Sequence, residues 1–336
     1  MKKILLFILL ILISFLAQGK VVASLEEISQ PKMMSLSKDY LLITEGSSIF
    51  VYSMKDFSLV KKFGKEGEGP KEFKVSPFGP PMIAYFYKGN IFVSSNSKIS
   101  YFTAKGEFIK EMRTMPFIVF RPFHDLYVAT GTTVNDKKET VLTVNIHNQK
   151  LEKVREIYQS DMSVGPNASF SYPMNTFNFE PYKDNLYLVR GKDGFVIDVM
   201  TKEGKKLYTI KKDYEEIKVT KEYRDKTFQN FKTDPNFKQF FDYFKQRIKF
   251  KDTYPAIQDI RVTDDRIYVT TFKKKNMETE CIILDLKGNE VKRVFVPYPE
   301  LYGMDYLPEY DIYNKKFYIL IENDDDEVWE LHVMDL

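Results

Sequence analysis

Short apolar runs, most of them with an aromatic residue, recur along the chain between residues 40 and 319. The six runs are Tyr40-Leu41-Leu42-Ile43, Asn90-Ile91-Phe92-Val93, Asp125-Leu126-Tyr127-Val128, Asn185-Leu186-Tyr187-Leu188, Arg266-Ile267-Tyr268-Val269 and Lys316-Phe317-Tyr318-Ile319. Runs this short are typical of strands rather than of helices. Leu41 and Phe317 are 317 − 41 = 276 positions apart over five intervals. The repeat is therefore about 55 residues long, near the period of propeller blades.

A second strand-like segment follows each run. These segments are Ile49-Phe50-Val51-Tyr52, Ile99-Ser100-Tyr101-Phe102, Leu142-Thr143-Val144-Asn145, Phe195-Val196-Ile197-Asp198, Ile282-Ile283-Leu284-Asp285 and Trp329-Glu330-Leu331-His332. In five units a tight turn leads on to a third segment, with Gly106, Gly204 or Gly288 in three of the turns. Glycine supplies the positive φ that such turns need. With one more strand before each run, every unit is predicted to be a four-stranded antiparallel meander, and six such units make an all-β propeller.

The two ends of the chain predict how the ring closes. The last unit stops after Trp329 to Met334, one strand short of a full blade. Residues 20–28 precede the first unit and are free to supply the missing strand. Joining N- and C-terminal strands in one blade removes the open sheet edges that invite aggregation. We expect a six-bladed β-propeller over residues 20–336.

Residues 1–19 have the layout of a secretory signal peptide. Two lysines precede an apolar run from Ile4 to Ala17, and Ala17-Gln18-Gly19 places small residues at the −3 and −1 positions of a cleavage site. The apolar run is short for a membrane span, which needs about 20 residues. We expect a mature chain that starts near Lys20, is periplasmic or secreted, and has no transmembrane span. An uncleaved N-terminal anchor is the alternative.

Three stretches share a pattern with a known group of proteins. The second unit reads Pro81-Met82-Ile83-Ala84, Lys88-Gly89-Asn90-Ile91-Phe92-Val93, Asn96-Ser97-Lys98-Ile99-Ser100-Tyr101-Phe102 and Lys105-Gly106-Glu107-Phe108. Phe63 to Phe73 contains Gly-Glu-Gly-Pro-x-x-Phe, and Tyr254-Pro255-Ala256-Ile257 precedes Ile260-Arg261-Val262. These stretches resemble bacterial exported six-bladed β-propellers with NHL-type repeats. The resemblance implies a fold and export, and no set of catalytic residues.

Composition and charge exclude several classes of function. The 336 residues include 50 Lys and Arg against 47 Asp and Glu, a net charge of +3. A near-neutral chain argues against nucleic-acid binding, which needs a strongly basic surface. Cys281 is the single cysteine, so no disulfide forms within the chain, and its apolar surroundings predict a core position. The three histidines lack zinc spacing, and the sequence contains no serine nucleophile elbow.

The interval between the fourth and fifth units contains an insertion, at about residues 211–254. From Lys205 to Lys251 there are 14 Lys or Arg and 7 Asp or Glu. Asp234 and Pro235 predict the start of a helix. Its apolar stripe is Phe237, Phe240, Phe241, Phe244 and Ile248. A weaker helix is predicted from Thr220 to Phe231. We expect the insertion to pack over the propeller face beside the channel mouth, with contact between this basic segment and a membrane surface as the alternative.

Propeller topology places the loops after the recurring strands on one face, together with the connections between blades. Binding residues concentrate on loops held by a rigid scaffold. The candidates on this rim are Arg113, Arg190, Lys192, Asp193, Lys273, Lys274 and Tyr254. They predict a non-catalytic binding or scaffold propeller without a cofactor, whose partner is a protein, a peptide or a glycan.

A metal in the central channel is the alternative. Some six-bladed propellers that resemble gluconolactonases hold calcium there through Glu, Asn and Asp residues from different blades. Asn175, Glu180 and Asp259, with Asn178 beside them, lie on or near predicted inner strands. These residues are the candidate ligands of a calcium-dependent hydrolase.

Two loops have compositions that suggest ligand binding, but we interpret both as structural connections. The run Glu322 to Glu327 has five carboxylates in six positions, yet it lacks the spacing and the glycine of a calcium loop. The glycine-rich segment Gly64 to Phe73 lacks the Gly-Lys-Ser/Thr ending of a phosphate-binding loop. We expect the first to be a hairpin turn and the second to connect two blades, with Phe73 packed between the sheets.

Overall fold

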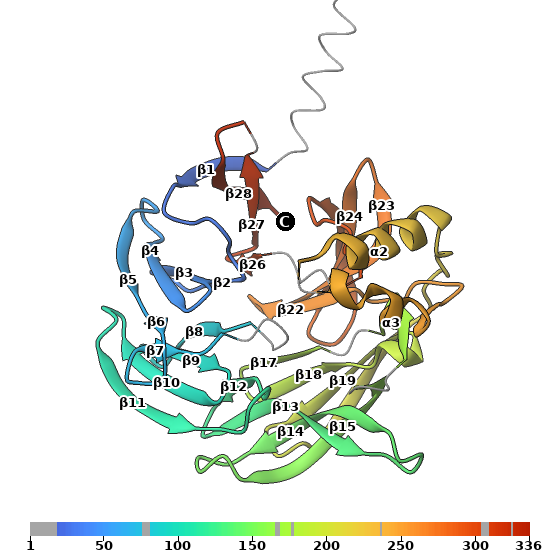
Figure 1. Cartoon of the computed structure of the whole chain (residues 1–336), viewed down its shortest axis with the longest axis horizontal. Helices are drawn as coiled ribbons and strands as arrows, with labels where there is room; N and C mark the ends of the chain where they lie inside the picture. The colour runs from blue at the N-terminus through green and yellow to red at the C-terminus, as the bar shows by residue number, and fades with distance from the viewer. Residues whose placement is uncertain are drawn as a thin grey trace, which may run out of the picture.

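Six four-stranded antiparallel sheets surround a central axis in the computed structural model of the chain (Figure 1). The structure describes residues 19–75, 81–164, 169–175, 178–235, 237–303, 309–323 and 325–336. The sheets follow the chain order, so each is one blade. The predicted six-bladed β-propeller is confirmed.

The strands of each blade are named below from the innermost, which lines the axis, to the outermost. Blade 1 consists of β2 (Met33–Leu36), β3 (Tyr40–Glu45), β4 (Ser48–Ser53) and β5 (Leu59–Phe63). Blade 2 consists of β8 (Ile83–Tyr87), β9 (Asn90–Ser95), β10 (Lys98–Thr103) and β11 (Phe108–Arg113). Blade 3 consists of β12 (Phe120–Phe123), β13 (Leu126–Val134), β14 (Thr140–His147) and β15 (Lys153–Ser163).

The remaining blades follow the same order. Blade 4 consists of β17 (Phe179–Tyr182), β18 (Asn185–Val189), β19 (Phe195–Thr201) and β20 (Lys206–Lys212). Blade 5 consists of β22 (Asp259–Thr263), β23 (Arg266–Lys275), β24 (Glu278–Asp285) and β25 (Glu290–Val296). Blade 6 consists of β26 (Tyr310–Tyr313), β27 (Lys316–Asn323), β28 (Val328–Asp335) and β1 (Lys20–Leu25).

The N-terminal strand closes the ring. β1 pairs antiparallel with β28, with Ser24 opposite Glu330 and Leu25 opposite Trp329. The indole N–H of Trp329 donates to the carbonyl of Ser29 at 3.0 Å, which ties the segment after β1 to the same blade. The closure predicted from the chain ends is confirmed.

Two-residue turns join the inner strand to the next strand in five blades. The residue pairs that flank these turns are Tyr87–Asn90, Phe123–Leu126, Tyr182–Asn185, Thr263–Arg266 and Tyr313–Lys316. Both turn residues have positive φ in Lys88-Gly89, Asp264-Asp265 and Asn314-Lys315, as type I′ hairpins require. Turns of fixed length set the register, so they also set which inner-strand side chains point into the channel.

The core is divided among the seams between neighbouring blades. Six clusters of buried side chains in the described structure each join two adjacent blades. Between blades 1 and 2, Phe73 is fully buried, and the rings of Phe63 and Phe102 lie 4.8 Å apart. Gly64 allows the chain to turn there, because its φ is +94° and a Cβ would meet the carbonyl oxygen of Ser47 at 2.4 Å. Phe73 therefore packs between sheets as predicted.

Cys281 lies in the cluster between blades 5 and 6. Its side chain is fully buried, and burial raises the pKa of the thiol to about 12. A protonated, enclosed thiol is a core residue and not a nucleophile. The predicted core position is confirmed.

The insertion contains the helix predicted from Thr220 to Phe231 but not the long helix predicted after Asp234. The longest helix is α2 (Lys221–Thr233), and the Thr220 hydroxyl accepts the N–H of Tyr223 at 3.1 Å as its N-cap. The segment with the phenylalanine stripe forms only the 3₁₀ turn η2 (Lys238–Phe240) and the short helix α3 (Phe241–Lys245). Ile248 lies in β21 (Ile248–Phe250), which pairs parallel with β16 (Phe170–Tyr172). The prediction of a single long helix after Asp234 is therefore wrong. Its apolar side chains contact different neighbours: Phe237 packs in the aromatic cluster of the insertion, and Ile248 pairs with Phe170.

The insertion packs onto the propeller as expected. Its aromatic cluster includes Tyr223, Phe231 and Phe237 from the insertion, and Phe272 of β23 packs against it. The ring of Phe272 stacks on Tyr254 with centroids 4.7 Å apart. α2 and α3 lie on the face that holds the blade-to-blade connections, which we call the insertion face (Figure 1). Among the described residues, no helix has the length and apolar composition that a membrane crossing needs.

The remaining short elements lie in connections. β6 (Lys65–Glu66) pairs parallel with β7 (Glu72–Phe73) between blades 1 and 2. The 3₁₀ turn η1 (Gly191–Asp193) lies between β18 and β19. Both are on the insertion face, because they belong to a blade connection and to a hairpin between second and third strands.

Candidate functional site

The inner strands of all six blades surround a cavity of about 410 Å³ on the axis. Every inner strand contributes to its wall, and one position recurs among the lining residues: in five blades it is the third residue before the two-residue turn. We call this set the channel ring. Its members, in blade order, are Ser35, Tyr85, Arg121, Glu180, Arg261 and Asp311.

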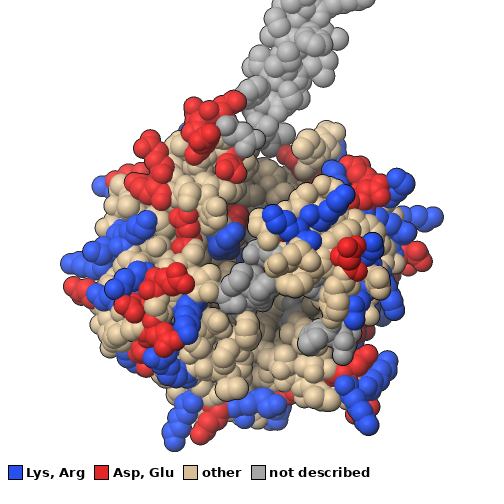
Figure 2. All heavy atoms as spheres, viewed as in Figure 1, with Lys and Arg blue, Asp and Glu red and all other residues tan. Residues whose placement is uncertain are grey.

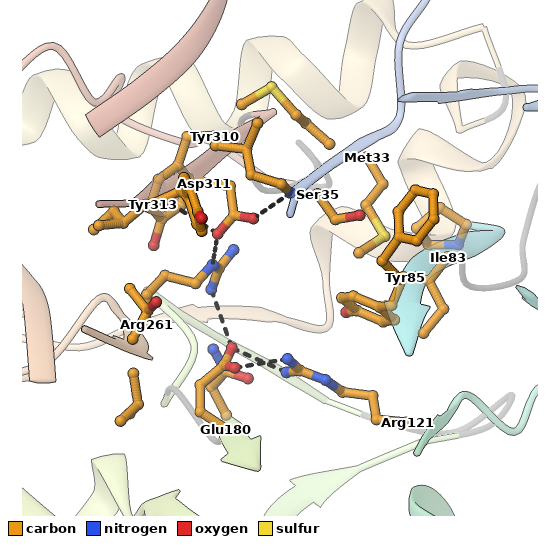
Figure 3. A pocket seen from close by; sticks show the side chains of 18 of the residues that line it. Met33, Ser35, Ile83, Tyr85, Arg121, Glu180, Arg261, Tyr310, Asp311 and Tyr313 are labelled. Atoms are coloured by element: carbon orange, nitrogen blue, oxygen red, sulfur yellow. Dashed lines mark hydrogen bonds and ion pairs between the residues drawn. The ribbon is translucent and has the colours of Figure 1, made fainter. Parts of the chain in front are cut away.

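Four neighbouring members of the channel ring carry alternating charges. Arg121 makes a bidentate pair with Glu180, with Nη1–Oε1 at 2.9 Å and Nη2–Oε2 at 2.6 Å. Nη1 of Arg261 lies 3.6 Å from Oε1 of Glu180, and its Nε lies 3.9 Å from Oδ1 of Asp311. Figure 3 shows Arg261 between the two carboxylates, across the hollow from Met33 and Tyr85. Ser35 and Tyr85 complete the ring as a neutral arc.

Asp259 anchors Arg261 from beneath the cavity wall. Its carboxylate is 1% exposed, and Oδ2 accepts Nη1 of Arg261 at 2.8 Å and the hydroxyl of Tyr310 at 2.7 Å. Asn178 donates to Oδ1 of the same carboxylate. Burial disfavours the charged form of Arg261, but the combined electrostatic effect of Asp259, Tyr310, Glu180 and Asp311 outweighs it, so the pKa of Arg261 lies well above its ordinary value. Arg261 is therefore a fixed cation.

Asp311 is a channel-ring carboxyl with a raised pKa. Its oxygens accept the backbone N–H groups of Leu36 and Ile312, both at 2.8 Å. Burial raises the pKa of its carboxyl to about 6, although Arg261 and the two N–H groups oppose that shift. The bond to Leu36 also joins blade 6 to blade 1, the first and last parts of the ring.

The candidate calcium ligands do not form one donor set. Glu180 and Asp259 are close together in the channel wall, but each is already bonded to a guanidinium group. Asn175 lies elsewhere, in a pocket of the insertion face, where it accepts from Lys251 at 2.6 Å and donates to Asp161 at 2.8 Å. Two fixed cations beside two carboxylates do not fit a calcium site. In the described part of the chain, no group of three or more His, Cys, Asp or Glu side chains is placed to hold a metal ion.

A second cavity, of about 430 Å³, lies on the insertion face between blade 4 and the insertion. It brings together three of the predicted rim residues, Lys192, Asp193 and Tyr254. Lys251, which the sequence reasoning missed, also lines it, and burial lowers the pKa of its ammonium group. The hydroxyl of Tyr254 is held by Glu300 at 2.8 Å.

The other predicted rim residues lie around this cavity or away from it. Arg190 pairs with Asp198 at 3.1 Å and Asp193 at 3.4 Å. Lys273 pairs with Glu215, which lines the cavity. Lys274 turns toward the carbonyl of Tyr298 at 2.9 Å, and burial lowers its pKa to about 8.

Arg113 is in a different sector. At the end of β11 it contacts the carbonyl of Glu68 at 3.4 Å. The loop candidates therefore share one face but do not form a single site.

The channel ring contains functional candidates that loop-centred reasoning does not find. Arg121, Arg261 and Asp311 stand in short inner strands of four or five residues. The sequence signal that could have identified them is their constant spacing to the following turn. A charged residue at the same position of successive repeats predicts a charged ring on the axis.

The chain matches no protein-family model and no curated protein. It is similar in structure to the WD40 domain of Neurospora crassa Pan2, with a TM-score of 0.47 and 8% identity over 94% of this chain and 95% of that one. It is also similar to Kluyveromyces lactis Hsv2, with a TM-score of 0.40 and 10% identity over 91% and 98% of the two chains. A third likeness is to the β-propeller domain of Myceliophteria thermophila Cps50 (Swd1), with a TM-score of 0.38 and 9% identity over 93% and 98%. The sheet order of the chain itself, and not these likenesses, establishes a six-bladed β-propeller.

Proposed function

We propose that the chain is an exported, non-catalytic propeller that binds a protein partner through its insertion face. The observation that carries this proposal is the distribution of exposed large apolar side chains. Apart from the outer strands, the described loops of one face of the ring bear such side chains and the described turns of the other face do not.

The exposed large apolar residues of the described structure fall into two groups. Those on the outermost strands are Val21, Val60, Ile109, Val154, Leu207, Tyr208 and Val291. All others lie on the insertion face, and they are Val75, Met115, Phe117, Val134, Phe240, Tyr243, Met277 and Ile321. None of the described turns on the opposite face has such a residue. Exposed apolar groups gathered on one face mark an interaction site.

Two of these side chains are the most exposed of the group. Met277, at the tip of the β23–β24 hairpin, is 92% exposed, and Met115, between blades 2 and 3, is 70% exposed. Methionine is a flexible apolar side chain that adapts to a partner surface. A bound partner would remove both from water.

The charges of the insertion face favour a protein over a membrane. Lys273, Lys274 and Lys275 lie on the strand that leads to Met277, whereas Glu322 and Glu327 flank the hairpin of blade 6. Figure 2 shows basic and acidic side chains mixed around the rim of the face in view. An anionic membrane would be repelled by the acidic sector, whereas a protein can match both signs. A peptide or glycan ligand in the cavity beside Lys192, and membrane contact, remain alternatives.

Export is part of the proposal. It is supported by the signal-peptide pattern of residues 1–19, of which residues 1–18 lie outside the described residues. β1 begins at Lys20, so cleavage before that residue would leave every strand in place. N-terminal sequencing of the protein from the cell envelope fraction tests this part, and an uncleaved chain in the membrane fraction would support the anchor.

Native electrophoresis of the cell extract tests the binding role. The wild-type chain is expected to migrate as an assembly larger than the chain alone, whose full 336 residues have a mass of 39.6 kDa. The triple variant Met115→Ser, Phe117→Ser and Met277→Ser is expected to migrate as the monomer, because it removes apolar contacts without touching the core. The matched control changes Val60, Val154 and Val291 on the outer strands to Ser. Equal loss of the assembly in both variants, or no assembly at all, would contradict the proposal.

A further inference from the structure

We propose that the channel cavity binds a small neutral saccharide of one or two sugar units. This inference concerns the axis of the ring and is independent of the protein partner proposed for the insertion face. It rests on the size of the cavity, the pairing of its charges, its unused hydrogen-bonding groups and its apolar wall.

The size of the cavity suits a small ligand. Its volume of about 410 Å³ lies within the range of about 300 to 1,000 Å³ found for small-molecule sites. All six inner strands line it. A ligand there would contact every blade.

Every charge that faces the cavity is paired within the channel wall, and Asp259 adds a third carboxylate behind Arg261. Asp311, Arg261, Glu180 and Arg121 alternate in sign from blade 6 to blade 3. Each charge already has an opposite neighbour, and Lys32 at the edge of the lining is exposed. A ligand with a net charge would bring an uncompensated charge into a partly buried site, which costs free energy. The ring therefore selects neutral ligands.

The same side chains retain hydrogen-bonding capacity toward the cavity. Nη1 of Arg261 bonds to Asp259 and to the carbonyl of Ile260, but within the described structure Nη2 makes no hydrogen bond. The oxygens of Asp311 each accept one backbone N–H and retain a further lone pair. Neighbouring donors and acceptors of this kind match neighbouring hydroxyl groups, because each hydroxyl both donates and accepts.

The opposite wall is apolar. Met33, Ile83, Tyr85 and Phe86 line it, and Figure 3 shows Met33, Ile83 and Tyr85 across the hollow from Arg261 and Asp311. A sugar ring has polar hydroxyls around its rim and C–H groups on its faces. A ring seated with its rim toward Arg261 and Asp311 would lay a C–H face on this wall.

Three hexoses that differ only at C6 test the selection for neutrality. Glucose is neutral, glucuronate is anionic and 6-amino-6-deoxyglucose is cationic at neutral pH. Ligand-observed NMR with the purified full chain is extended to galactose, mannose, N-acetylglucosamine and cellobiose. At least one neutral saccharide is expected to bind, and more tightly than any charged hexose. A charged hexose that binds equally well or better, or a neutral panel without a binder, would overturn the proposal.

Two variants assign the binding to the channel ring. Arg261→Lys keeps the charge but removes Nη2, and is expected to weaken binding of the neutral saccharide at least about 10-fold. Its matched control is Arg266→Lys in the same blade, where the guanidinium bonds to the carbonyl of Asp265 outside the cavity. Asp311→Asn removes one negative charge from the cavity wall and is expected to shift preference toward glucuronate. Melting temperatures show whether each variant is folded, and unchanged affinity in a folded Arg261→Lys variant would contradict the assignment.

Discussion

At the scale of single residues, the channel places charge where the chain can neutralise it. Arg121, Glu180, Arg261 and Asp311 are one-fifth exposed or less, and each has an opposite charge beside it. Isolated charges at this depth would be costly, whereas an alternating row is tolerated. The sequence alone indicated only Glu180, as a calcium ligand, because pairing between residues in different blades depends on ring geometry that no local pattern displays.

The pH dependence of stability should reveal Asp311. Burial raises the pKa of its carboxyl from 3.8 to about 6, so between these pH values the folded chain holds the proton and the unfolded chain has lost it. Ionisation of Asp311 therefore lowers the free energy of unfolding as the pH rises. Asp311→Asn has no such proton, so its free energy of unfolding relative to wild type should increase by about 2 kcal/mol from pH 4 to pH 7. Denaturant titrations at both pH values measure this, and a difference that does not change with pH would contradict the assignment.

The Arg121–Glu180 pair should be strongly coupled. Arg121→Leu leaves Glu180, which is 7% exposed, with only the more distant Arg261, and is expected to cost about 3 kcal/mol. The double variant with Glu180→Leu removes both charges and should be more stable than Arg121→Leu alone. A double-mutant cycle in urea measures the coupling. Additive losses in the cycle would show that the two side chains act independently.

At the scale of elements, the repeat was predictable, whereas the insertion was predictable only in its first helix and its packing on the propeller. The recurring runs became β3, β9, β13, β18, β23 and β27, since a strand buried on both faces has a distinctive continuous apolar pattern. In the insertion, Phe237 is buried, Phe240 is exposed and Ile248 enters a parallel pair with Phe170. The spacing of these residues matched a helix, but a pairing with a strand more than seventy residues earlier overrode it.

The closure of blade 6 gives a prediction at this scale. A chain that starts at Lys20 keeps β1 and should be as stable as the longer chain. A chain that starts at Glu26 lacks β1 and exposes the edge of β28, so it should melt at a lower temperature and aggregate. Differential scanning calorimetry and light scattering compare the two. Equal behaviour would show that β1 contributes nothing to closure.

At the scale of the whole molecule, the same scaffold presents two different faces. The turns between first and second strands are short and polar, as in Lys88-Gly89 and Asp264-Asp265. The insertion face carries the longer loops, α2, the second cavity and the apolar tips such as Phe117 and Met277. Propeller topology made this division of loops predictable, but it did not show which loops expose apolar groups, because that depends on packing around each loop.

Metal chelation separates the binding proposal from the calcium alternative. Glu180 and Asp259 are bonded to guanidinium groups, so removal of calcium should leave the melting temperature unchanged. Thermal melts with EDTA and with added calcium measure this on the purified chain. A large loss of melting temperature on chelation, with calcium near one per chain, would restore the hydrolase hypothesis.

Site-specific photo-crosslinking in the native cell tests the central claim most directly. A photoreactive amino acid is placed at Met277 and Phe117 on the insertion face, at Val60 and Val291 on the outer strands, and at Lys202 in a turn of the opposite face. The binding account predicts one discrete adduct with a protein from both insertion-face positions and none from the other three. Adducts from the outer strands or the opposite face, or no adduct from Met277 and Phe117, would contradict it.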